Sequence, residues 1–129
     1  MGKLVLTLAI LLLSGIASAQ VIDVPHANEA PTRTLLVSVA KPRAVVLLFP
    51  GGGGMPVISD SGAIKSRHTF VRSLDLWAQY GINAVLVDSP YDLGDLRRGN
   101  LRGRDDHLSR VDEVVSFYKN KFDLPVWIF

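Results

Sequence analysis

Three short segments made almost entirely of apolar residues constrain the fold most strongly. They span residues 43–49, 82–87 and 124–129. Near-continuous apolar runs of this length are typical of strands that are covered on both faces. Between them, apolar residues recur at helical spacing over residues 70–78 and 108–122. This alternation of strands and helices predicts an α/β fold, with a mostly parallel sheet and flanking helices.

The segment before residue 43 carries weaker signals. Residues 34–40 mix alternating and β-branched residues, which indicates a further strand. Residues 21–31 are polar and contain Pro25 and Pro31, which interrupt regular strands. We therefore expect an extended segment there, with a short edge strand over residues 21–24.

The N-terminus has the pattern of a secretory signal peptide over residues 1–19. Lys3 precedes an apolar run over residues 4–13, and the small residues 17–19 form a cleavage site. The alternative is a membrane anchor, but the run is well short of the roughly 20 apolar residues that span a bilayer. We therefore expect cleavage, no stable membrane anchor, and residues 20–129 as the N-terminal part of one domain.

Composition narrows the compartment and the class of partner. The chain has no cysteine, and export without disulfides fits a periplasmic or secreted protein. The chain has 14 Lys and Arg and 12 Asp and Glu. Lys3 is the only one of these in residues 1–19, so the net charge of the mature chain is 13 − 12 = +1. This balance argues against nucleic acid or an anionic membrane surface as the partner.

A run of glycines, Gly51–Gly54, follows Pro50 directly after the first apolar segment. Glycine-rich turns after a parallel strand let backbone N–H groups face an anion. Two phosphate-binding patterns fail, because no glycine precedes Lys65-Ser66 and the G-x-G-x-x-G spacing from the first glycine ends at Pro56. An oxyanion hole needs only one or two donors at the end of a central strand, so the loop predicts one. A merely flexible loop is the alternative.

Together, these segments resemble part of the α/β-hydrolase family, of the exported esterase- or lipase-like kind. Residues 50–54 resemble the loop after the third strand, and residues 68–90 the following helix and strand. Residues 107–129 resemble the helix and strand that lead to the nucleophile turn, so the resemblance covers nearly all of residues 43–129. It implies a serine hydrolase with a small-molecule ester or acyl substrate in the full-length protein, and no cofactor.

The resemblance also suggests which glycines act. Lipase-type loops often begin His-Gly-Gly-Gly, and here Pro50 takes the position of the histidine. By position, the backbone of Gly52 is the first candidate for the oxyanion donor, with Gly53 next and Gly51 as the third.

The family's nucleophile is missing from this pattern. No Gly-x-Ser-x-Gly turn occurs, and neither Ser61 nor Ser89, the serines with glycine nearby, sits in one. We therefore assign no catalytic residue and expect the serine, acid and histidine beyond Phe129. The expected fold is an incomplete α/β-hydrolase fold that ends before the nucleophile turn and is inactive alone. Its last strand would be an open apolar edge, prone to self-association and low solubility.

Two polar residues are candidates for the wall of the site, each with a simpler structural alternative. Asp88 ends a strand at the edge where α/β sites lie, but turn formation with Ser89-Pro90 is favoured. His107 follows Asp105 and Asp106 at a helix start, where capping and compensation of the helix dipole are favoured. Adjacent acids point to different faces, so no metal site is expected.

The remaining polar and aromatic residues are expected to be structural or solvated. Among them, His26 is expected in solvent and His68 in the first turn of a helix. A solvated surface loop is favoured over an anion-contacting lid for the four arginines Arg97, Arg98, Arg102 and Arg104. Trp77 and Trp127 are expected in the core.

Two other hypotheses stay open. In the first, the chain is a small exported binding protein without catalysis, which holds an anion at the glycine loop or a partner strand at its open edge. Alternatively, a separate chain completes the fold.

Overall fold

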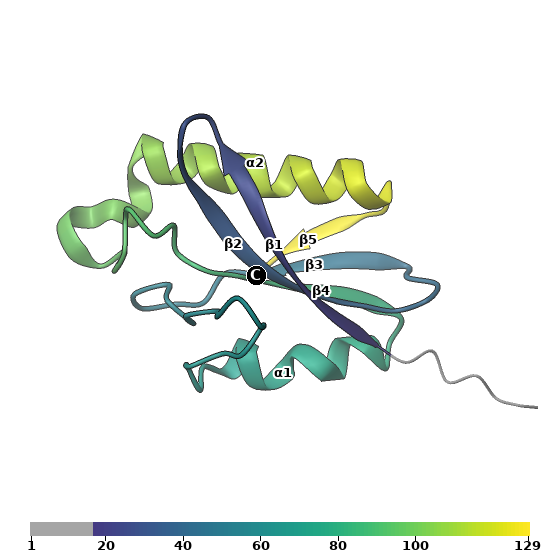
Figure 1. Ribbon diagram of the computed structural model, residues 1–129. Coiled ribbons are helices and arrows are strands. Elements are labelled where there is room, and N and C mark those ends of the chain that lie inside the picture. Colours follow the sequence, from purple (N-terminus) through teal and green to yellow (C-terminus); the bar gives the residue numbers. More distant parts are fainter. Residues whose placement is uncertain (1–16) are drawn as a thin grey trace, which may run out of the picture.

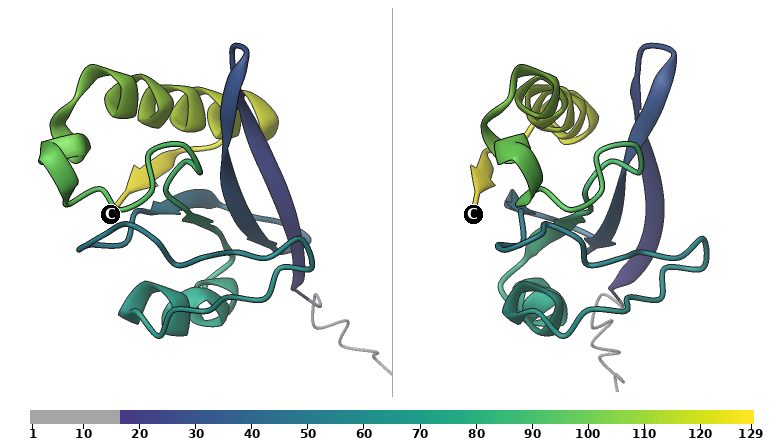
Figure 2. Two further views of the ribbon diagram at one scale, coloured as in Figure 1. Left: turned by 60° about the vertical axis from the view of Figure 1, so that its left-hand side comes forward. Right: turned by 90° about the vertical axis from the view of Figure 1, so that its left-hand side faces the viewer.

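The computed structural model describes residues 17–129, which form a five-stranded mixed sheet between two helices (Figure 1). Helix α1 covers one face of the sheet and α2 the other, as two turned views also show (Figure 2). The strand order is β1-β2-β4-β3-β5. The elements are β1 (Ser18–His26), β2 (Glu29–Ser38), β3 (Ala44–Leu48), α1 (Thr69–Ala78), β4 (Ile82–Val87), the 3-10 segment η1 (Arg98–Gly103), α2 (Asp105–Phe122) and β5 (Val126–Ile128).

The three apolar segments form neighbouring parallel strands, as predicted. β3 lies between β4 and β5 and pairs in parallel with both. Helix α1 connects β3 to β4, and α2 lies between β4 and β5 in the chain. The predicted α/β fold with flanking helices is therefore confirmed.

Strand β3 is buried on both faces because its side chains alternate between two cores. Val45 and Leu47 join the cluster under α2, whereas Val46 and Leu48 join the cluster over α1. All four are at most 1% exposed. A continuous apolar sequence is what a strand with two covered faces requires.

The prediction of a mostly parallel sheet is matched only in part. β1 pairs antiparallel with β2, and β2 pairs antiparallel with β4, so two of the four strand pairs are antiparallel. Residues 21–31, expected to be extended with a short edge strand over residues 21–24, belong to this longer hairpin. Pro25 is accommodated because the register shifts between Val24 and His26, where a bulge removes the need for its missing N–H.

Two further expectations differ from the structure. Trp127 is 61% exposed on β5 rather than in the core, whereas Trp77 packs against the cluster over α1. His26 is not solvated, because its Nδ1 lies 2.8 Å from a carboxylate oxygen of Glu113 on α2. The signal-peptide prediction concerns residues 1–19, of which 1–16 lie outside the described residues. Among residues 17–129, neither helix has the length and apolarity that crossing a bilayer requires.

A buried hydrogen-bond pair ties α2 to the hairpin. The Thr34 hydroxyl donates to the carbonyl oxygen of Ile22 at 2.8 Å, and it also contacts the Tyr118 hydroxyl. Since a carbonyl only accepts, Tyr118 must be the donor to Thr34. Burial raises the pKa of Tyr118 to about 12, so this donor stays protonated at neutral pH.

Tyr118→Phe removes this donor and keeps the ring. We expect the free energy of unfolding to fall by about 1 kcal/mol, the usual net contribution of such a bond. Urea unfolding followed by circular dichroism measures the change. Tyr80→Phe is the matched control, because Tyr80 is 65% exposed; equal effects of the two variants would contradict the role of Tyr118.

Candidate functional site

The glycine loop lies at the carboxyl edge of the parallel strands. It begins at Pro50, two residues after β3 ends at Leu48, and Phe49 still pairs with Phe129 beyond β5. In open α/β sheets, ligands bind outside the carboxyl ends of the strands. The loop is therefore placed where a site is expected in this fold class.

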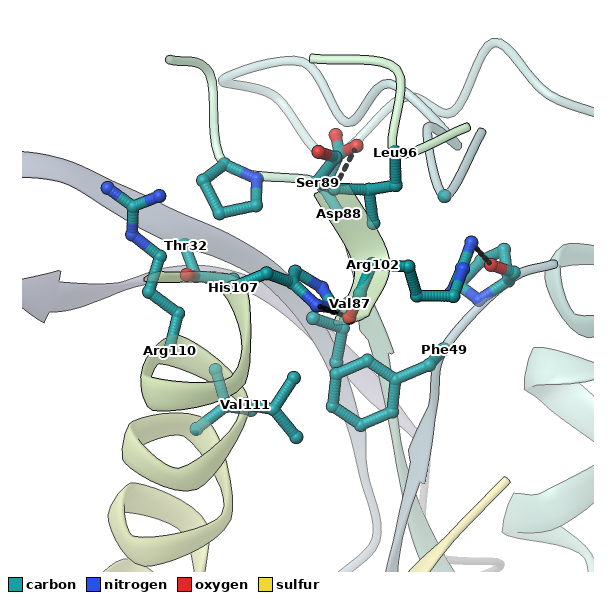
Figure 3. A pocket seen from close by; sticks show the side chains of 14 residues that line it. Thr32, Phe49, Val87, Asp88, Ser89, Leu96, Arg102, His107, Arg110 and Val111 are labelled. Carbon is teal, nitrogen blue, oxygen red and sulfur yellow. Dashed lines mark hydrogen bonds between the residues drawn. The ribbon is translucent and has the colours of Figure 1, made fainter. Parts of the chain in front are cut away.

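The side chain of Arg102 holds the loop from one side (Figure 3). Its Nη2 donates to the carbonyl oxygen of Gly52 at 2.8 Å and to that of Pro50 at 3.3 Å. The carbonyl of Arg102 in turn lies 2.8 Å from Nδ1 of the buried His107. Because a carbonyl only accepts, His107 donates this bond, so α2 anchors the residue that anchors the glycines.

This clamp fixes the direction of two N–H groups. In a trans peptide the C=O and the following N–H point in opposite directions, and no peptide bond among the described residues is cis. Arg102 binds the carbonyls of Pro50 and Gly52, so the N–H groups of Gly51 and Gly53 point away from it. Within residues 17–129, the N–H groups of Gly51, Gly52 and Gly53 have no hydrogen-bond acceptor.

A cavity of about 240 Å³ opens beside these groups, and we call it the glycine-loop cavity. Gly51 and Gly53 line it, whereas Gly52 does not. Its other lining residues are Pro50, Met55, Pro56, Ser66, His68, Asp95 and Arg97.

Backbone bonds restrain the far end of the loop. The carbonyl of Gly53 accepts from Leu96 N at 3.0 Å, and that of Gly54 accepts from Ser89 N at 2.9 Å. Gly54 has a φ of +67°, and a side-chain carbon there would lie 2.7 Å from Leu96 Cδ1. The glycine is required at this position, and the loop is held rather than merely flexible.

Asp88, which follows β4 at the carboxyl edge of the sheet, holds two neighbouring backbone segments. Its Oδ1 accepts from Ser89 N at 2.9 Å, the turn contact that we predicted, and its Oδ2 accepts from Ile58 N at 2.8 Å. Burial raises the pKa of Asp88, although the bonds from Ile58 and Ser89 oppose the shift.

A larger cavity of about 570 Å³, the β2–β4 cavity, lies beside Asp88. It is lined by Asp88, Ser89, Pro90, Tyr91 and Gly94, and by residues of the hairpin and of the 55–58 segment. Met55 lines both this cavity and the glycine-loop cavity, so the two adjoin.

The polar residues at the start of α2 have different surroundings. Asp105 and Asp106 lie in the first turn of α2, as expected from dipole compensation. His107 lines a small cavity of about 20 Å³ with Arg102 and Arg110 (Figure 3). No group of three acidic or histidine side chains among residues 17–129 is arranged to hold a metal ion.

Two arginines were not identified as site residues from the sequence. Arg102 was expected in a solvated loop, but its guanidinium holds the glycines. Arg110 is only 1% exposed and pairs with Glu29 at 3.0 Å and Asp92 at 2.7 Å. Neither position has a local signal that separates it from a surface arginine on the same segment.

The two serines near glycine are not paired with histidine. The Ser61 hydroxyl lies 3.0 Å from that of Ser59. The Ser89 hydroxyl donates to the carbonyl of Gly94. Neither has the adjacent base that activates a serine nucleophile among the described residues.

The comparisons with known proteins bear on the fold. The structure matches that of a dienelactone hydrolase from Anabaena variabilis ATCC 29413, with a TM-score of 0.62 and 17% sequence identity. The likeness is one of fold, which is similar to that of this hydrolase. The match covers 88% of this chain and 51% of the other, so this chain spans about half the length of that hydrolase. No protein-family model matches the chain, and no curated protein matches it.

Arg102→Met removes both donors to the glycine loop at similar side-chain length. We expect the amide order parameters of Gly51–Gly53 to fall from about 0.85 to below about 0.6, as measured by ¹⁵N relaxation. Arg98→Met is the control, because Arg98 is exposed in the same segment. Unchanged order parameters in Arg102→Met would show that the clamp does not hold the loop.

Asp88→Asn tests the buried carboxyl through pH dependence. The pKa of Asp88 is raised above its ordinary 3.8, so the folded state binds this proton more tightly and loses stability as pH rises through that pKa. We expect the stability advantage of the wild type over Asp88→Asn to be largest below pH 3.8 and to shrink as pH rises. Urea unfolding over a pH series measures it.

Asp95→Asn provides a control of opposite sign. Arg97 lowers the pKa of Asp95 to about 2, so its contribution is present above pH 3.8 and is lost as pH falls toward 2. An Asp88→Asn difference that grows with pH would contradict the assignment.

Proposed function

We propose that this chain carries the N-terminal part of an exported serine hydrolase that cleaves ester or similar acyl bonds. The glycine loop supplies the oxyanion hole, and the nucleophile, acid and histidine come from residues beyond 129. One observation carries the proposal: the N–H groups of Gly51 and Gly53 have no partner among the described residues, and both glycines line a cavity at the carboxyl edge of β3.

The chemistry explains why such groups matter. Attack of a serine oxygen on an acyl carbon moves the carbonyl electrons onto oxygen, and the resulting tetrahedral species carries negative charge there. Donors that already point at this position need no reorganisation during the reaction. The lining of the glycine-loop cavity favours Gly51 and Gly53 as those donors over Gly52.

The adjoining β2–β4 cavity supports a small-molecule substrate. Its volume of about 570 Å³ falls in the usual range of ligand pockets. In this proposal the acyl or alcohol portion of the substrate lies there, with Asp88 in the wall. His107 acts behind the loop by holding Arg102.

Hydrolysis of p-nitrophenyl acetate and butyrate by the purified chain tests the proposal, with fluorophosphonate labelling in parallel. We expect neither turnover nor label from residues 1–129, because no activated serine lies among the described residues. The DNA downstream of the Phe129 codon should encode a Gly-x-Ser-x-Gly turn within a few codons. The longer product should then both turn over the esters and take the label at that serine.

Two outcomes would contradict it. Turnover by the 129-residue chain with a label on Ser61 or Ser89 would show an unrecognised nucleophile. A longer product that contains the turn but neither reacts with the probe nor hydrolyses either ester would remove the hydrolase proposal.

A second candidate is binding of a partner strand, including that of a second copy. β5 lies at the end of the strand order, and its residues Trp127 and Ile128 and the following Phe129 are each more than half exposed. A strand can add to such an edge through backbone hydrogen bonds. Sedimentation of the same preparation at rising concentration separates a monomer from a self-associating chain.

A further inference from the structure

The ring of His68 is held in one tautomer. Its Nδ1 accepts from the backbone N–H of Phe70 at 3.2 Å, which makes His68 the N-cap of α1. Because a backbone N–H can only donate, Nδ1 carries the lone pair and the neutral ring carries its proton on Nε2. The ring also packs against the edge of the Phe70 ring, with centroids 5.2 Å apart. Two contacts therefore fix the direction of the Nε2–H donor.

This donor lies beside the glycine loop. A side-chain carbon built on Gly51 would lie 3.9 Å from His68 Nε2. His68 lines the glycine-loop cavity together with Gly51 and Gly53. Within residues 17–129, no acceptor is hydrogen-bonded to Nε2, which leaves it available to a ligand.

The charged residues of the same cavity do not exclude an anion. Asp95 lies close to Gly53, but Arg97 binds its carboxylate through Nε at 3.0 Å and through Nη2 at 2.7 Å. Arg97 holds the pKa of Asp95 at about 2, so the pair stays ionised at neutral pH and its charges cancel.

We propose that His68 is the third donor of this anion site, so that Gly51 N–H, Gly53 N–H and His68 Nε2–H converge on one tetrahedral, negatively charged centre. The inference rests on the proposed function and deepens it, because it adds a side-chain donor to the backbone donors of the loop. His68 thus supplies from α1 a side-chain donor that Pro50 cannot supply from the loop itself.

Diethyl phosphate, a tetrahedral monoanion, tests the inference by NMR titration of the ¹⁵N-labelled chain. We expect the amides of Gly51 and Gly53 and the Nε2 resonance of His68 to shift together. His68→Asn keeps a capping acceptor for Phe70 N but lacks the reach of the imidazole. We expect it to weaken binding about tenfold, the usual effect of losing a hydrogen bond to a charged group.

His26→Asn is the matched control, because His26 contacts Glu113 on α2 rather than the loop. It should leave the affinity unchanged, and the α1 amides should keep their positions in His68→Asn. If Gly51 and Gly53 shift while Nε2 does not, and His68→Asn binds equally well, His68 is not a donor and the oxyanion proposal stands. If neither glycine responds, both proposals are overturned.

Discussion

The hydrogen bonds from Arg102 to the carbonyls of Pro50 and Gly52 determine what the glycine loop can do. Four consecutive glycines have little intrinsic preference for any conformation. A cation that binds the carbonyls of Pro50 and Gly52 from one side leaves the N–H group that follows each of them, on Gly51 and Gly53, facing the other side. The order of this loop is thus imposed by tertiary contacts, and glycine only permits it.

The sheet provides the support that this arrangement needs. β3 is nearly fully buried between α1 and α2, so the point from which the loop departs is fixed. α2 presents His107 to the carbonyl of Arg102, and His68, the N-cap of α1, lines the cavity beside Gly51 and Gly53. The starts of both helices therefore support the glycine loop, α2 indirectly through Arg102 and α1 through its N-cap His68 beside Gly51.

Local signals predicted the parts of the fold that depend on local chemistry. The apolar runs of β3 and β4 and the glycines at the strand end were identified correctly. Buried strands require apolar residues and tight turns favour glycine, so both are visible in the local sequence. The long hairpin was missed because Pro25 and Pro31 argue against a strand, and only the register shift near His26 shows how one is accommodated. The position of Trp127 was wrong because its exposure depends on which elements cover β5, not on its own apolarity.

The site was predicted less completely than the fold. The sequence pointed to Gly51–Gly53, and Asp88 showed its turn contact. Arg102 could not be distinguished from Arg97, Arg98 and Arg104 in the sequence, because all four are arginines in one segment. Only the fold shows which of them contacts the glycine loop. The same holds for His68, whose ring orientation depends on a single backbone N–H.

The clamp joins residues that are 50 positions apart in the sequence. The connection between β4 and α2 thus helps to hold the conformation of the glycine loop, although it contains none of the four consecutive glycines. A protease that nicks the exposed stretch around Tyr91 or Arg98 would cut no bond in the loop. Such a nick would nevertheless free the peptide that carries Arg102 from one of its two attachments. The conformation of the glycines would then depend on how firmly α2 and the backbone hydrogen bond from Arg102 to Leu96 retain that peptide.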